Sequence, residues 1–131
     1  MSKAYELGLY EKAMPGTLTW KERLEAAKAA GYDYVEISID ATEEKIARLD
    51  MDRESRLELV KTMYETGIPI RTMCVSALTK YAIGSSDEAC CARGMAILEK
   101  SLQLADDLGI RVVMIIMKNQ HWIQNTDFLK I

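Results

Sequence analysis

Three glycines divide the chain into similar units. Gly31, Gly67 and Gly109 each follow a segment with the apolar periodicity of a helix, and each precedes a short run of apolar, aromatic or β-branched residues. Glycine is favoured just past the last turn of a helix, whereas such runs are typical of strands. This repeated order of helix, glycine and strand indicates an α/β fold in which long crossovers join parallel strands.

Four segments are expected to be strands. The clearest covers 32–40, where apolar and polar side chains alternate from Val35 to Asp40. The other three cover 6–13, 68–77 and 110–117. Pro69 stands near the start of its segment, where a missing backbone donor matters least. We therefore predict about four parallel strands with three to four helices.

Capping residues and apolar stripes define the helices. Thr19, Asp52 and Ser86 are the predicted N-caps of three long helices, and Thr42 begins a short helical turn. One stripe is expected to share a face of the second long helix, and its members are Leu57, Val60 and Tyr64. The stripe expected on the third comprises Ile97, Ser101, Leu104 and Leu108, widened by Leu98, Leu102 and Ala105.

Composition argues against several classes of protein. The 131 residues are 49% hydrophobic and 28% charged, which is typical of one globular domain. The net charge of -3 gives no basic field for nucleic acid, and no apolar run reaches the roughly 20 residues of a membrane helix. The start lacks the organisation of a signal peptide, and three cysteines do not resemble a secreted disulfide framework. We expect a cytoplasmic protein with reduced thiols.

The number of strands limits the architecture. An eight-stranded (β/α)₈ barrel typically needs about 250 residues, and this chain supplies about half of that number of units. Half of a barrel leaves two open edges with unpaired backbone groups. The alternatives are a small open sheet, self-association through those edges, or poor stability.

Several strings occur in a characteristic order and spacing. They are LGLYEKAMP at 7–15, YDYVEISID at 32–40, RLDMDRESR at 48–56, TMCVSA at 72–77, IGSSDE at 83–88 and ADDLGIRVV at 105–113. Together they resemble the L-ribulose-5-phosphate (L-xylulose-5-phosphate) 3-epimerases, also called hexulose-6-phosphate isomerases. The resemblance implies the N-terminal half of a xylose-isomerase-like TIM barrel and covers nearly all of 7–113.

The resemblance also implies a reaction. Full-length relatives are expected to epimerise a ketopentose phosphate at C3 with a divalent metal and two acidic residues, because the enediolate formed by proton removal needs charge stabilisation. The family's metal ligands and catalytic glutamates lie on later strands. No catalytic residue and no metal ligand is therefore assigned here, and the chain alone is expected to be inactive and to bind no metal specifically.

Two stretches depart from the family pattern. After the third predicted strand, Leu78 stands where relatives usually have a histidine. After Val113 the tail lacks the expected strand end and tyrosine-rich loop, although a shifted reading frame can spell a peptide like that loop. We interpret 1–113 as a partial TIM-barrel domain and 114–131 as an atypical tail, and we hypothesise that a frameshift produced it.

Candidate binding residues lie where strands are expected to end, because the C-terminal rim of a barrel carries the active site. The substrate-contact candidates are Tyr10, Glu11, Lys12, Glu36, Ser38 and Ser76. Glu36 has an alternative role as a carboxylate held in a polar layer by neighbouring donors. Lys12 and Lys80 could each hold a phosphate, although exposed lysines are common on loops. The single histidine, His121, lies in the atypical tail and receives no role.

Three functional interpretations remain open at this point. The first is descent from an epimerase, the second is a half-barrel that acts as an interaction module or self-associates, and the third is a product of gene decay. The sequence favours the first for ancestry and the third for present activity. The resemblance also makes a sugar phosphate the expected partner of full-length relatives.

Overall fold

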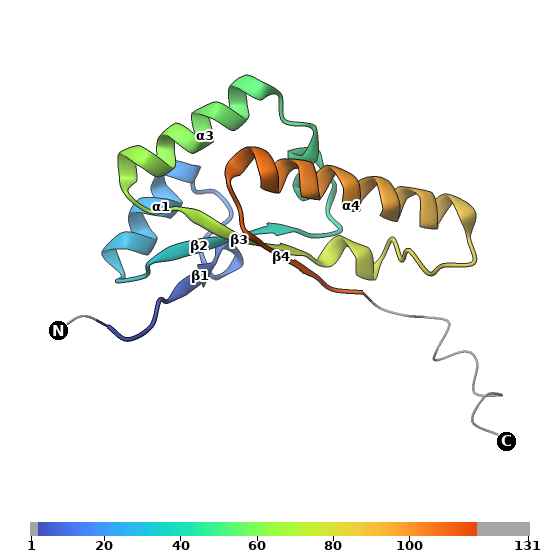
Figure 1. Ribbon diagram of the computed structural model, residues 1–131, viewed down its shortest axis with the longest axis horizontal. Helices are drawn as coiled ribbons and strands as arrows, with labels where there is room; N and C mark the ends of the chain where they lie inside the picture. The colour runs from blue at the N-terminus through green and yellow to red at the C-terminus, as the bar shows by residue number, and fades with distance from the viewer. Residues whose placement is uncertain (1–2, 118–131) are drawn as a thin grey trace, which may run out of the picture.

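The computed structural model describes residues 3–117 and contains one parallel sheet (Figure 1). Its strands are β1 (Gly8–Tyr10), β2 (Tyr34–Ile39), β3 (Ile70–Val75) and β4 (Val112–Ile115). They lie in the order β1-β2-β3-β4, so that each strand pairs with the next one along the chain. The predicted strands are confirmed in number and direction.

Three long helices connect these strands. They are α1 (Trp20–Ala29), α3 (Arg53–Thr66) and α4 (Glu88–Leu108), and a short helix, α2 (Glu43–Ala47), precedes α3. Three 3₁₀ turns are η1 (Glu11–Ala13), η2 (Arg48–Asp50) and η3 (Ser76–Thr79). Figure 1 shows the long helices together on one side of the sheet. The other side carries no helix among the described residues.

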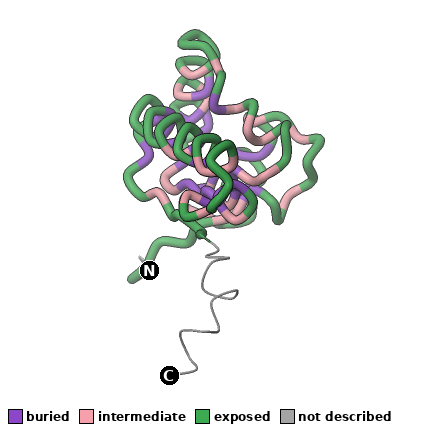
Figure 2. Tube along the Cα trace, turned by 90° about the vertical axis from the view of Figure 1, so that its right-hand side faces the viewer, coloured by how far each residue is buried: buried purple, intermediate pink, exposed green. Residues whose placement is uncertain are grey.

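The core lies between the sheet and this helical layer. Val35, Ile37 and Ile39 of β2 are fully buried, as are Leu24 of α1 and Leu104 of α4. Figure 2 shows the buried positions gathered inside the trace, with exposed positions around them. Each such side chain contributes roughly 1.5–3 kcal/mol by leaving water, so this layer is the main source of stability.

The helix ends follow from local hydrogen bonding. Thr19 forms a capping box with Glu22, and Asp52 caps α3 by accepting from the Ser55 backbone N–H at 2.8 Å. At the end of α3, Gly67 has φ of 74°, a left-handed conformation that suits glycine. One predicted cap is wrong: Asp87, not Ser86, is the N-cap of α4. Both residue types cap well, and the Asp87 carboxylate also interacts favourably with the helix dipole.

The predicted apolar stripe of α3 lies mostly outside the core, and only Val60 of its members packs against it. Its members are Leu57, with 57% exposure, Val60, which is half-buried, and Tyr64, with 85% exposure. The side chains that face the sheet layer are Leu59, Met63 and Thr66. Both sets have helical spacing, and tertiary packing selects the second. The prediction that Leu102 widens the stripe of α4 is also wrong, because that side chain is 49% exposed.

Strand ends are shorter than the sequence predicts. β1 stops at Tyr10 because η1 begins at Glu11, and β3 stops at Val75 because η3 begins at Ser76. β4 pairs Met114 and Ile115 with β3, so it crosses the predicted domain boundary after Val113. That boundary stays a prediction, and most of the tail lies outside the described residues.

This topology corresponds to half of an eight-stranded barrel, so the predicted fold class is confirmed. The helices would form the outer ring, and the bare side of the sheet would face the barrel interior. Large apolar side chains on or just after β4 remain exposed: Val112, Met114, Ile115, Ile116 and Met117. Over residues 3–117, no helix is both long and apolar enough to cross a membrane.

Candidate functional site

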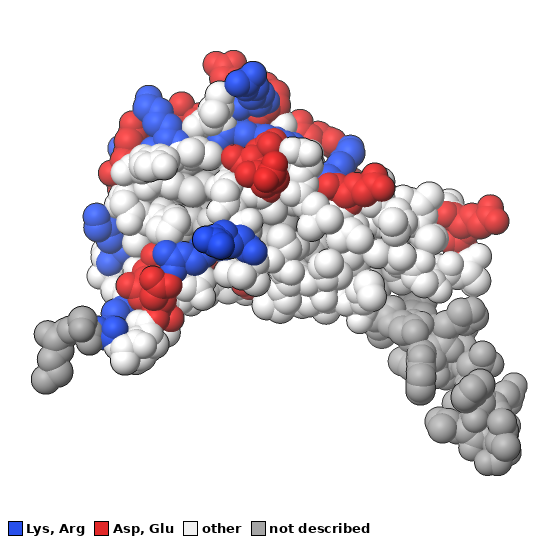
Figure 3. Space-filling view, viewed as in Figure 1, with Lys and Arg blue, Asp and Glu red and all other residues white. Residues whose placement is uncertain are grey.

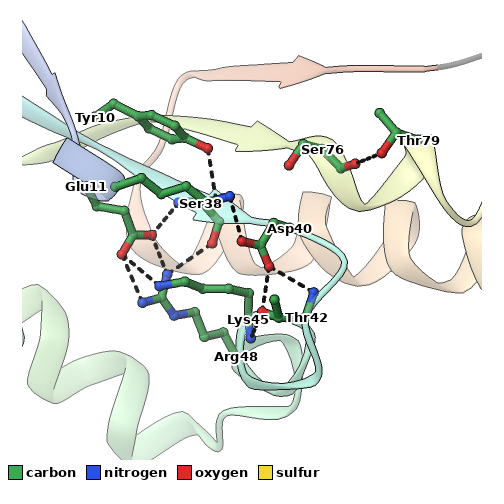
Figure 4. A network of polar contacts seen from close by, with 10 residues as sticks. Tyr10, Glu11, Ser38, Asp40, Thr42, Lys45, Arg48, Ser76 and Thr79 are labelled. Carbon is green, nitrogen blue, oxygen red and sulfur yellow. Dashed lines mark hydrogen bonds and ion pairs between the residues drawn. The ribbon is translucent and has the colours of Figure 1, made fainter. Parts of the chain in front are cut away.

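The carboxyl ends of β1, β2 and β3 meet at one end of the sheet, where Figure 4 shows a network of polar side chains. Tyr10 ends β1, Ser38 is the buried penultimate residue of β2, and Ser76 follows β3 directly. Parallel strands place these residues at a common edge although they are far apart in sequence.

A pair of hydroxyl groups lies on the uncovered side of the sheet. The Tyr10 hydroxyl donates to Ser38 Oγ at 3.0 Å. Burial raises the pKa of Tyr10, and the hydrogen bond to Ser38 only partly offsets that effect. The phenol is therefore neutral near pH 7 and can exchange hydrogen bonds with a polar ligand.

Glu11 is the most enclosed charge of this region, with a side chain only 1% exposed. It accepts from the Ser38 backbone N–H and from Arg48 Nη1, while Arg48 Nη2 and Lys45 Nζ donate to its other oxygen at 3.0 and 3.2 Å. Burial alone would raise the Glu11 pKa, but Arg48, Ser38 and Lys45 outweigh it and the pKa is lowered. Glu11 is thus a fixed carboxylate with both oxygens engaged.

Arg48 joins the short helical segment after β2 to the rest of the network. Its Nη1 also donates to the Ser38 carbonyl at 3.0 Å, and its guanidinium lies 5.1 Å from the centre of the Trp20 ring. Stacking of this kind and bidentate pairing are what a planar guanidinium does well. Glu11 thus binds the backbone N–H of Ser38, and Arg48 binds its carbonyl.

A second ion pair lies beside the first. Lys12 Nζ is 2.6 Å from Asp40 Oδ2, and Thr42 donates to Asp40 Oδ1 from its backbone N–H at 2.9 Å and from its hydroxyl at 2.6 Å. Burial opposes ionisation of Asp40, but these donors prevail and lower its pKa to about 2. The pKa of Lys12 is raised by the same hydrogen bond. Lys12 keeps its charge and remains 43% exposed.

The other two candidates are less closely connected. Thr72 donates to Glu36 Oε2 at 2.7 Å, which is the polar-layer arrangement considered as the alternative role of Glu36. The Ser76 carbonyl accepts from the Thr79 hydroxyl at 2.8 Å. Leu78, at the position of the family histidine, is fully buried in the core. An apolar side chain therefore fills that position.

The structure brings Tyr10, Glu11 and Ser38 into one network and places Lys12 beside it. It does not join Glu36 or Ser76 to them by a hydrogen bond in the described part of the chain. All six assignments stay predictions. Residues 3–117 contain no group of three or more His, Cys, Asp or Glu side chains that could hold a metal ion, and His121 lies outside the described residues.

Sequence reasoning missed four members of the network: Trp20, Asp40, Lys45 and Arg48. Asp40 was only the last residue of a predicted strand, and nothing local marks Arg48 as the partner of a carboxylate 37 positions earlier. Elementary chemistry offers one signal, because a carboxylate expected at a buried rim needs a cationic partner. Lys45 and Arg48, on the segment after β2, could have been predicted as the partners of Glu11 on that ground.

Comparison with known proteins gives matches along most of the chain. L-ribulose-5-phosphate 3-epimerase UlaE of Escherichia coli O157:H7 is 48% identical over 113 residues, which is 86% of this chain and 40% of that protein. UlaE of Shigella sonnei matches to the same extent. The chain therefore spans about two fifths of the length of these relatives.

Solved structures show the same fold at lower sequence identity. A D-psicose 3-epimerase superposes with a TM-score of 0.67 at 18% identity, covering 85% of this chain and 37% of the other. A D-allulose 3-epimerase from Methylomonas sp. gives a TM-score of 0.62 at 23% identity, covering 84% and 36%. The family model for the xylose isomerase-like TIM barrel matches residues 24–127. The chain belongs to the xylose isomerase-like TIM barrel family.

Proposed function

We propose that this chain provides the N-terminal, substrate-binding part of a sugar-phosphate 3-epimerase that interconverts L-ribulose 5-phosphate and L-xylulose 5-phosphate. The observation that carries the proposal is 48% identity to L-ribulose-5-phosphate 3-epimerases across 86% of the chain. The polar network at the rim adds a physical reason, because it lies where barrel enzymes of this kind bind their substrates.

The residues at the rim suit a polyhydroxylated ligand. The neutral Tyr10 hydroxyl can donate to and accept from sugar hydroxyls, while Ser38, which is fully buried, accepts from that hydroxyl and fixes its position. Lys12 offers a positive charge for the phosphate, with Asp40 fixing its position. Ser76, at the start of η3, and Glu36, on β2, are further contact candidates. We assign Glu11 to the same site mainly as the group that positions Ser38, because its oxygens are already engaged.

Epimerisation at C3 requires a proton to leave one face of the carbon and another to arrive on the opposite face. The intermediate carries enediolate charge, which a divalent metal would stabilise in full-length relatives. The described residues do not fit that role, because they contain no suitable group of metal ligands. We derive no metal-dependent step from them. Their part is to bind and orient the sugar phosphate.

We therefore propose that the chain alone does not turn over substrate. Sites of TIM barrels are built from loops that follow several different strands, and the described residues provide four strands of eight. A titration of the purified 131-residue chain with L-ribulose 5-phosphate tests the binding role. We expect saturable binding that Tyr10→Phe weakens about three- to tenfold, the loss of roughly one hydrogen bond.

Tyr5→Phe is the matched control, since Tyr5 is 65% exposed and precedes β1. It should leave the affinity unchanged. Absence of binding, or equal effects of the two substitutions, would contradict the assignment of Tyr10. Epimerisation assayed with added Mn²⁺, Zn²⁺ or Mg²⁺ is the second test, with a full-length relative as positive control. Metal-dependent turnover by this chain would refute its proposed inactivity.

The second candidate function is self-association through the open sheet. Val112, Met114 and Ile115 of the β4 edge are 56%, 47% and 42% exposed, and Figure 3 shows a largely uncharged surface along the lower edge of the described residues, to the right of the charged cluster. Parallel sheets normally have both faces covered. Met114→Lys should weaken association if this edge is the contact, and unchanged association would exclude it.

Two further proposals concern origin and location. We propose that a shifted reading frame produced the sequence after Val113. The codons of the gene test this directly: if the shifted frame does not encode a peptide like the family loop, the proposal is wrong. We also propose a cytoplasmic location. Cys74, Cys90 and Cys91 are all free thiols, as expected in a reducing compartment. Fractionation of the source cells would test the location.

A further inference from the structure

The segment that follows β3 is held against α4 by two thiols. It comprises η3 and residues 80–87, and Figure 1 shows it in yellow-green and yellow, below the first part of α4. The Cys91 thiol donates to the Ile83 carbonyl at 2.9 Å, and the Cys90 thiol donates to the Lys80 carbonyl at 3.5 Å. Two adjacent side chains of one helix therefore bind two carbonyls of the same segment.

Gly94 continues this contact one turn further along α4. A Cβ atom at Gly94 would lie 2.2 Å from the Tyr81 carbonyl oxygen, so the absence of a side chain lets the two backbones approach this closely. The Arg93 guanidinium also lies 4.3 Å from the centre of the Tyr81 ring. The carbonyls of Lys80, Tyr81 and Ile83 thus all meet the same stretch of α4.

The thiols that bind this segment differ in exposure from the third cysteine. Cys90 and Cys91 are half-buried, whereas Cys74 of β3 is buried. A reagent in the solvent can therefore reach the first two while the chain stays folded. A sulfur atom that has formed a bond to another group has lost its proton and no longer donates. Modification of either sulfur removes a hydrogen bond to the segment and adds bulk where the segment packs on α4.

We propose that Cys90 and Cys91 form a modification site, at which a small disulfide of the glutathione type makes a mixed disulfide and releases the segment after β3 from α4. The protein thiolate attacks one sulfur of the small disulfide, a new S–S bond forms as the old one breaks, and the other half leaves as a thiolate that takes up a proton. The protein sulfur is oxidised and the small disulfide is reduced. One adduct is enough, because each thiol binds its own carbonyl.

The position of the segment gives the modification a consequence for the rim. Ser76 is the first residue of η3 and one of the proposed substrate contacts. Release of the segment would change the surroundings of that hydroxyl and weaken the binding of a sugar phosphate. This consequence rests on the proposed function, whereas the modification and the release of the segment do not.

Limited proteolysis with trypsin reports the release directly, because trypsin cleaves after lysine and the Lys80 carbonyl is the group that Cys90 binds. Incubation of the intact chain with glutathione disulfide should give an adduct at Cys90 or Cys91, located by peptide mass mapping, and should leave Cys74 unmodified. Cleavage after Lys80 should become roughly fivefold faster, as expected for the loss of about one hydrogen bond. Dithiothreitol should reverse both effects.

Cleavage after Lys21 is the internal control, because this exposed lysine lies on α1 and has no contact with the segment in the described residues. Its rate should not change with the adduct. Equal acceleration after Lys21 and Lys80 would mean that the adduct unfolds the whole chain, and it would overturn the proposal.

Two double variants separate the hydrogen bonds from the chemistry of sulfur. Serine can donate to a carbonyl but forms no disulfide, so Cys90→Ser with Cys91→Ser should keep the slow cleavage after Lys80 and should not respond to glutathione disulfide. Cys90→Ala with Cys91→Ala lacks both donors and should be cleaved rapidly without any reagent. Circular dichroism checks that both variants fold. Absence of an adduct, an adduct that leaves cleavage after Lys80 unchanged, or equal cleavage of the two variants would overturn the proposal.

Discussion

The two sides of the sheet differ in what their side chains contact. On the helical side, alternate residues of β2 and β3 are fully buried against α1, α3 and α4. On the other side, Tyr10 and Ser38 form a hydroxyl pair, Glu36 accepts from Thr72, and Met114 is exposed. The helical side supplies most of the buried apolar contacts, and we propose that the uncovered side supplies polar groups for a ligand. The two roles should respond differently to substitution.

The largest expected effect comes from Glu11, which ties the ends of the strands to the segment carrying Arg48. Glu11→Gln leaves Arg48 and Lys45, which are 12% and 13% exposed, without their shared carboxylate. Removing one partner from a buried ion pair typically costs about 3–5 kcal/mol. Urea unfolding should report a loss of this order. A loss below about 1 kcal/mol would show that the network contributes little to stability.

A methionine pair compares the two sides directly. Met73 of β3 is fully buried on the helical side, and Met114 of β4 is 47% exposed. Met73→Ala should lower the free energy of unfolding by about 2–4 kcal/mol, because it leaves a cavity, whereas Met114→Ala should change it by about 0.5 kcal/mol or less. Thermal and urea unfolding of both variants measure the difference. Equal losses would contradict the division of roles.

Acid should lower the free energy of unfolding by protonating Asp40 at the rim. Its pKa of about 2 lies below the ordinary value of 3.8, so its stabilising contribution is complete above about pH 4 and is lost as the pH falls toward 2. Allowing for solvent screening, the contribution is on the order of 1–2 kcal/mol. Lys12→Met should remove part of this pH dependence. Unfolding curves at several acidic pH values test it, and an unchanged slope would exclude the Lys12 pair as a cause.

The smallest expected effect is that of the hydroxyl pair on stability. Tyr10→Phe removes one partly buried hydrogen bond to Ser38 and should cost about 0.5–1 kcal/mol. Its effect on ligand binding should be at least as large if the uncovered side serves binding. Comparing urea midpoints with affinity for L-ribulose 5-phosphate separates the two. A loss of stability of several kcal/mol with unchanged affinity would assign Tyr10 to the core.

Local features of the fold could be predicted from the sequence. The alternation in 32–40 marks β2, and Thr19, Asp52 and the three glycines mark helix ends because they act through neighbours in the chain. The barrel topology was predicted from the resemblance to the epimerase family. The predictions that failed concern places where the local sequence allows two arrangements equally well. Ser86 and Asp87 can both cap a helix, and α3 carries two apolar stripes of which only one faces the sheet.

The candidate site was predictable only in part. The rule that barrel sites lie at strand ends located Tyr10, Glu11 and Ser38. It could not show that Glu11 is engaged by Arg48, because the two residues are 37 positions apart and their contact depends on how the segment after β2 folds back. The ion pair between Lys12 and Asp40 likewise joins two strand ends that only the register of β1 and β2 brings together.

The strand order has a consequence for synthesis on the ribosome. Because the order is β1-β2-β3-β4, each of β2, β3 and β4 pairs with a strand that was made earlier, and no later strand has to be inserted between two neighbours. Nascent chains emerge at roughly 5–20 residues per second, and N-terminal parts fold first. Each new helix and strand can therefore add to a growing edge, and the last edge to form is β4.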